Sequence, residues 1–208
     1  MTNETLYLGA NPLNASATAV EGDYVTRDGE SFYRIANIDG MDDFFISVVS
    51  DSNHWMFIST RGGLSAGRTA CDSALFPYYT EDKILDNSDN TGSRTIVIAN
   101  QDGKRMLWEP FSRSHTGIYS ITRNLYKNVL GDKLIFEETN HDLGLQFTYS
   151  WSTSDRFGFV KQSTIAATGN AESAVEILDG IENLLPYGVL AGTQNELSCL
   201  VDAYKKNE

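Results

Sequence analysis

The sequence predicts an all-β protein built from antiparallel sheets, and residues 94–165 carry the observations behind this. Successive runs in this segment combine β-branched or aromatic residues with alternation of apolar and polar side chains, as a half-buried strand requires. Short polar turns join the runs, for example 100–103 (Asn-Gln-Asp-Gly) and 152–155 (Ser-Thr-Ser-Asp). Parallel strands would need crossover helices, and no helical pattern stands between these runs. We therefore expect an antiparallel meander within a sandwich of two sheets or a barrel.

Individual strands are expected at each run of this kind. Residues 30–38 (ESFYRIANI) alternate well enough for a half-buried strand, and 94–99 (RTIVIA) is a compact β-branched run before a hairpin turn signal. The expected strands are 30–38, 44–49, 55–59, 94–99, 105–109, 117–126, 133–139, 144–151 and 156–165, and 173–178 is also compatible with a strand.

The C-terminal segment changes character. Residues 195–204 (NELSCLVDAY) place apolar side chains at Leu197, Leu200, Val201 and Tyr204, the spacing of an amphipathic helix. The expected organisation is an N-terminal arm or edge strand, the antiparallel sandwich and an amphipathic helix, over residues 1–22, 23–190 and 191–208. Because an apolar helical stripe needs a surface to pack on, we expect this helix to begin a linker to a further domain of a longer protein.

Composition limits the classes of partner. The 208 residues carry a formal charge of −12, from 28 acidic and 16 basic side chains, and this repels nucleic acid and anionic membranes. No apolar run approaches the ~20 residues of a membrane span, and the N-terminus lacks the pattern of a signal peptide, so we expect a cytoplasmic protein. Cys71 and Cys199 have no metal or redox spacing, and no cofactor or metal is expected.

Several segments resemble a known family. They are the run 55–68 (WMFISTRGGLSAGR), the aromatic segment 75–79 (LFPYY), 107–111 (LWEPF) and 184–189 (LLPYGV). Together they resemble the N-terminal β-domain of cellobiose-phosphorylase-like glycoside phosphorylases. The resemblance implies a galactose-mutarotase-like supersandwich that binds carbohydrate or mediates assembly. It also implies that catalysis belongs to a downstream helical domain, which this chain does not include.

Five residues are the candidates for contact with a saccharide. Guanidinium groups can hold pairs of sugar hydroxyls, aromatic rings can cover the apolar face of a pyranose, and imidazole can donate or accept a hydrogen bond. The candidates are Arg61, Arg68, Trp108, Arg113 and His115. The alternative interpretation gives the arginines weak surface ion pairs, the tryptophan a place in the core and the histidine a solvated loop.

Two other functions stay open at this level. One is a mutarotase-like sugar epimerase in which His115 or His141 acts with a glutamate. The other is a structural domain that forms a homodimer through the apolar stripe at Leu197, Leu200 and Val201. The adjacent pair Glu137–Glu138 does not form a glycosidase dyad by itself, because neighbours in a strand point to opposite faces.

Overall fold

The computed structural model describes residues 6–9, 11–12, 18–76, 84–85, 88–169, 173–186, 188–190, 192–193 and 196–197. Over these ranges its elements are strands and two three-residue 3-10 helices, beside helical residues at 84, 192–193 and 196–197, and the paired strands are antiparallel. This confirms the predicted all-β antiparallel fold. The strands are β1 (Tyr7–Leu8), β2 (Asn11–Pro12), β3 (Glu21–Arg27), β4 (Glu30–Ala36), β5 (Phe45–Val48), β6 (His54–Ser59), β7 (Leu64–Arg68), β8 (Gly92–Gln101), β9 (Lys104–Trp108), β10 (Ile121–Asn128), β11 (Lys133–Asn140), β12 (Leu145–Ser154), β13 (Gly158–Ala167) and β14 (Ala174–Glu182), and the 3-10 helices are η1 (Ile38–Gly40) and η2 (Cys71–Ser73).

The chain divides into two compact units. The first consists of Met1–Asp42, Arg94–Ser152 and Val160–Gly180, and the second of Asp43–Ser93, Thr153–Phe159 and Ile181–Glu208. The sandwich expected over 23–190 thus contributes segments to both units.

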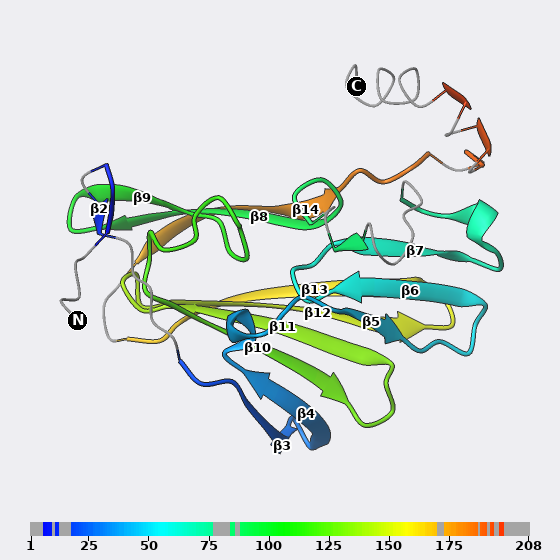
Figure 1. Cartoon of the computed structure of the whole chain (residues 1–208), viewed down its shortest axis with the longest axis horizontal. Helices are drawn as coiled ribbons and strands as arrows, with labels where there is room; N and C mark the ends of the chain where they lie inside the picture. Colours follow the sequence, from blue (N-terminus) through cyan, green and yellow to red (C-terminus); the bar gives the residue numbers. More distant parts are fainter. Residues whose placement is uncertain are drawn as a thin grey trace. The chain divides into compact units, whose positions relative to one another are not determined.

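The first unit has the character of a β-sandwich. A six-stranded sheet runs in the order β13-β12-β11-β10-β4-β3, and a three-stranded sheet runs β14-β8-β9. Figure 1 shows β8, β9 and β14 as one layer and β10 to β13 as a second layer. Alternation explains the core side of β12, where every second residue from 145 to 151 is buried, whereas β11 is buried on both faces over residues 134–138. Phe136 and Tyr149 are register partners in this core and stack with ring centroids 4.7 Å apart.

The six-stranded sheet has an outer face, on the side away from Phe136 and Tyr149, and the β3–β4 hairpin bends toward it. Arg27 at the end of β3 donates to Glu137 on β11, although β4 and β10 lie between these strands. In a flat sheet the two strands would stand about 14 Å apart, which is beyond the reach of an arginine side chain. The hairpin therefore curls, and beneath it the buried Phe32, Tyr126 and Ile135 form a small apolar cluster.

The second unit contains the three-stranded sheet β5-β6-β7. One face of this sheet is buried, and it carries Ile46, Val48, Met56, Ile58, Leu64 and Ala66. The chain returns to this unit after β14, where the Leu185 amide donates to the Leu75 carbonyl at 2.7 Å. Residues 64–68, where no strand was expected, form the strand β7.

The expected C-terminal helix lies mostly outside the described residues. Leu200, Val201 and Tyr204 are among the residues not described, so the helix and the dimer interface based on it stay predictions. Leu197 is described and is 48% exposed. In the part of the chain that the structure covers, no helix is both long enough and apolar enough to span a bilayer.

Candidate functional site

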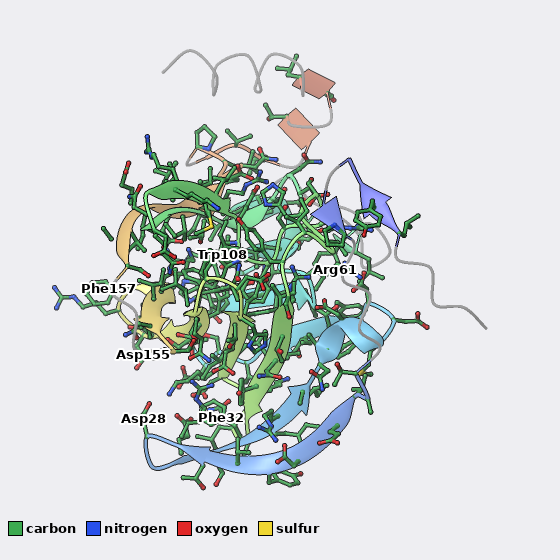
Figure 2. All side chains as sticks on the ribbon, turned by 90° about the vertical axis from the view of Figure 1, so that its left-hand side faces the viewer. Asp28, Phe32, Arg61, Trp108, Asp155 and Phe157 are labelled. Carbon is green, nitrogen blue, oxygen red and sulfur yellow. The ribbon has the colours of Figure 1, made fainter. Side chains whose placement is uncertain are left out.

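Three of the five predicted contact residues lie in one segment. Trp108 ends β9, and Arg113 and His115 lie in residues 109–119, which we call the 109–119 loop. It follows β9 and precedes β10. Trp108 at its start is 1% exposed, and its indole Nε1 donates to Glu138 Oε1 at 2.7 Å. Figure 2 shows this tryptophan surrounded by other side chains. The ring packs in the core of the first unit, so we leave it out of the surface offered to a ligand.

A buried ion pair anchors the loop to the six-stranded sheet. Glu138 accepts the Phe111 amide at 2.6 Å and Arg123 Nε at 2.7 Å. Arg123 also donates to Asp39 Oδ1 at 3.1 Å and to the Ser112 carbonyl at 3.3 Å. Burial disfavours the charged guanidinium, but Glu138 and Asp39 outweigh it and raise the pKa of Arg123. The guanidinium of Arg123 therefore stays protonated and holds the loop backbone through the Ser112 carbonyl.

Phe111 provides the apolar part of the same anchor. Its ring meets those of Phe136 and Tyr149 edge to face, at centroid distances of 6.0 and 5.3 Å, and Arg123 lies over it at 5.7 Å. The backbone of Phe111 has a φ of 64°, a left-handed conformation that costs a non-glycine residue about 1–2 kcal/mol. The ring contacts, and the hydrogen bond that the Phe111 amide donates to Glu138, offset that strain. They hold the loop backbone in one conformation.

Glu109, the first residue of the loop, has polar neighbours on β8 and further along the loop. We call Arg94, Glu109, Arg113 and His115 the loop site. Glu109 forms an ion pair with Arg94 and lies with its Oε2 4.0 Å from His115 Nε2. His115 Nδ1 is buried and has no hydrogen-bond partner among the described residues. Arg113 is exposed. A carboxylate, an imidazole and guanidinium groups thus come from one short segment and the neighbouring strand.

Arg61 and Arg68 belong to the second unit. Arg61 follows the end of β6, and its Nε donates to both carboxylate oxygens of Asp43, at 2.7 and 2.6 Å. Arg68 is exposed at the last position of β7, where it is the register partner of His54. Arg61 precedes β7 and Arg68 ends it, so the length of a strand, about 13 Å, separates them. The structure does not bring these two arginines together.

A second polar cluster was not predicted from the sequence. On the outer face of the six-stranded sheet, Glu137 accepts the Tyr126 hydroxyl at 2.7 Å, Asn124 Nδ2 at 3.0 Å and Arg27 NH1 at 3.0 Å. Burial, and then the bond to Glu137, raise the pKa of Tyr126 to about 12. Alternation does place Glu137 and Glu138 on opposite faces, but no local pattern identifies partners so distant in sequence.

The other histidine weighed for catalysis has a different neighbour. His141 is exposed, and its Nε2 lies 2.7 Å from the Thr122 hydroxyl. Over the described ranges, no group of three or more His, Cys, Asp or Glu side chains is arranged to hold a metal ion. Cys71 is exposed with a free thiol, and Cys199 lies outside the described residues.

Comparison with known proteins adds no identification. No protein-family model matches the sequence, and a search of curated proteins finds no match. Function is therefore inferred from the chemistry of the loop site and from the residue patterns of the chain.

Proposed function

We propose that this chain is a carbohydrate-binding β-domain and that the loop site holds a neutral saccharide. The observation that carries the proposal is the Glu109 carboxylate, which stands beside the guanidinium of Arg94 and the imidazole of His115. Sugar hydroxyls both donate and accept hydrogen bonds, so a site for them needs acceptors and donors close together. Glu109 supplies the acceptors, and Arg113 and His115 supply donors.

Apolar surface beside these groups suits the C–H face of a sugar ring. Leu107 precedes the loop and is 50% exposed, and Tyr119 at the loop's end donates its hydroxyl to the Leu107 carbonyl at 2.6 Å. Leu107 lies two residues before Glu109, which directly follows β9. A saccharide hydrogen-bonded to Glu109 would thus have an apolar side chain next to it.

The rigidity of the loop supports binding. Ordering a flexible loop on association reduces affinity, whereas a loop held in place beforehand avoids that cost. The buried bonds from Phe111 and Arg123 to Glu138 fix the backbone behind the loop site. This matches a binding loop carried by a stable β-scaffold.

We further propose a galactose-mutarotase-like supersandwich and a non-catalytic N-terminal role in a carbohydrate-active enzyme similar to cellobiose phosphorylases. The antiparallel all-β fold and the segments 55–68 and 107–111 support this assignment. In that setting the downstream helical domain would perform the reaction, and this chain would bind saccharide or shape the site.

Isothermal titration calorimetry tests the binding proposal. The purified chain is titrated with glucose, cellobiose and maltose, and at least one is expected to bind at millimolar concentration or tighter. Losing a hydrogen bond to a charged group costs about 1.5–3 kcal/mol, so Glu109→Gln should weaken binding roughly tenfold to a hundredfold. Arg113→Ala should weaken it as well.

Matched controls are available on exposed strands and turns. Glu176→Gln removes a carboxylate that pairs with Arg105 on the surface, and Arg156→Ala removes an arginine that lies over the ring of Phe157. Both should bind saccharide like the wild type. Absence of binding to all three sugars, or equal affinity in Glu109→Gln and the wild type, overturns the proposal.

The contact between His115 and Glu109 favours a second candidate function, sugar epimerisation. Opening a hexose ring needs an acid and a base that address the ring oxygen and the anomeric hydroxyl, and an imidazole beside a carboxylate can serve as such a pair. Polarimetry on freshly dissolved galactose or glucose checks this. The protein should accelerate the approach to equilibrium, and His115→Asn should remove the effect. A rate equal to that in buffer eliminates the enzyme hypothesis for these sugars.

A further inference from the structure

Two tyrosine rings stand exposed on the β3–β4 hairpin. Tyr24 is 76% exposed and Tyr33 is 43% exposed. They are register partners on adjacent strands, and their ring centroids lie 5.2 Å apart at an interplanar angle of 70°. The rings meet edge to face and form a corner with aromatic surface on two sides.

The backbone of β3 positions the Tyr33 ring. A Cβ atom at Gly22 would lie 2.1 Å from the Tyr33 hydroxyl oxygen and 2.9 Å from its Cζ, so only glycine leaves room for the phenol there. Tyr33 therefore lies against the strand at Gly22.

Contacts on the opposite face hold the hairpin itself. Arg34 forms a bidentate salt bridge with Asp23, in which its Nε and NH2 donate to the two carboxylate oxygens at 2.9 and 3.0 Å. Phe32 is buried in the small apolar cluster, and Arg27 bridges to Glu137. Figure 2 shows Asp28 projecting from the tip of this hairpin. The two exposed rings thus sit on a strand pair whose other face is fixed to the sheet.

We propose that the Tyr24–Tyr33 corner is a second saccharide-binding surface, which takes the flat C–H face of a pyranose ring. The proposal rests on the proposed function in that the ligand is of the same chemical class, but it uses none of the loop-site residues. Aromatic rings attract the weakly positive C–H groups of a sugar, and stacking leaves the hydroxyls at the rim in water.

The charge of the chain and the polar side chains beside the two tyrosines favour a neutral saccharide as the ligand of this corner. The formal charge of −12 opposes phosphate-bearing ligands and the approach of a second copy of the chain. The register places Lys127 beside Tyr33, and the next pair along the hairpin is Thr26 and Ser31. An ammonium group and two hydroxyls are thus available on the same face for the rim of a sugar, at the side-chain spacing of neighbouring strands.

Two-dimensional amide NMR during titration with cellobiose tests the proposal. Saturable shifts are expected at amides of Tyr24, Tyr33 and their strand neighbours. Sorbitol carries hydroxyls but has no ring face, and it should leave these amides unshifted. Tyr24→Ala should weaken binding at the hairpin roughly threefold to tenfold, as expected for a lost aromatic contact. Gly22→Ala, which displaces the Tyr33 ring, should weaken it as well.

Controls separate this surface from the loop site. Phe157 is 71% exposed on a turn of the second unit, and Phe157→Ala should leave the hairpin shifts unchanged. Glu109→Gln should remove the shifts of the 109–119 loop and keep those of the hairpin. Hairpin amides that do not respond to cellobiose, or that respond equally to sorbitol, overturn the proposal even if the loop site binds. Sedimentation that reveals self-association abolished by Tyr24→Ala overturns it in favour of a dimer.

Discussion

Replacing the buried carboxylate of Glu138 should destabilise the fold more than any exposed charge change. The side chains of Glu138 and Arg123 are 2% and 7% exposed. Glu138 accepts hydrogen bonds from the Trp108 indole, the Phe111 amide and Arg123. In Glu138→Gln one oxygen becomes an NH₂ group that faces one of these donors. Among the described residues, Arg123 then retains only Asp39 as an ion-pair partner. Breaking a buried pair from one side costs about 3–5 kcal/mol, and we expect a loss of that size.

Urea unfolding followed by tryptophan fluorescence measures this loss. The matched control is Glu176→Gln, because Glu176 forms an exposed pair with Arg105, and pairs of that kind contribute about 0–1 kcal/mol. A double-mutant cycle with Arg123→Met should give a coupling energy of about 1–3 kcal/mol, since each single variant leaves the other group unpaired. If Glu138→Gln is no less stable than Glu176→Gln, the buried pair does not anchor the loop.

Two further predictions concern ionisation and backbone conformation. Tyr126 has its pKa raised from 10.0 to about 12 by burial and by Glu137, so the stability gained from its neutral phenol is complete below pH 10 and is lost as the pH rises toward 12. A tyrosinate absorbance titration should show a lower pKa in Glu137→Gln, and an unchanged value would contradict the pairing. Gly92→Ala should cost more than about 2 kcal/mol in urea unfolding, because φ is 116° there and a Cβ would lie 2.3 Å from the Gly62 carbonyl oxygen. Gly103→Ala has φ of 73° with open space around it and should cost about 1–2 kcal/mol from backbone strain alone, so equal losses would refute the steric argument.

Local patterns predicted the strands that alternate and the turns that need special backbone conformations. The run 94–99 and its turn at 100–103 predicted a hairpin, and β8 and β9 form it. Asp102 and Gly103 both have positive φ, the property that gives Asp-Gly its turn preference. Because this signal depends only on neighbours in the chain, the sequence was sufficient.

Strand β7 was missed because its signal is not local. Residues 64–68 (LSAGR) are mostly small and poor in β-branched side chains, so they resemble a loop. They form a strand because their small side chains leave room for the side chains of β6. A Cβ at Gly67 would lie 2.5 Å from the ring of Trp55. The need for that space arises only after β6 and β7 pair.

The sequence predicted which segment carries the candidate site, but it did not predict which residues that segment contacts. Residues 108–115 were identified from the loop and its polar side chains, but alternation could not say that Trp108 points inward to Glu138. The bond from Arg27 to Glu137 joins residues 110 positions apart. Contacts of this kind depend on the curl of the sheet, which no short window of sequence encodes.

Amide NMR of the whole chain with cellobiose, maltose and glucose is the decisive test of whether the 109–119 loop binds a neutral saccharide. We predict saturable shifts at amides between Glu109 and Tyr119 that disappear in Glu109→Gln. Spectra in which these amides do not move at millimolar saccharide would contradict the claim.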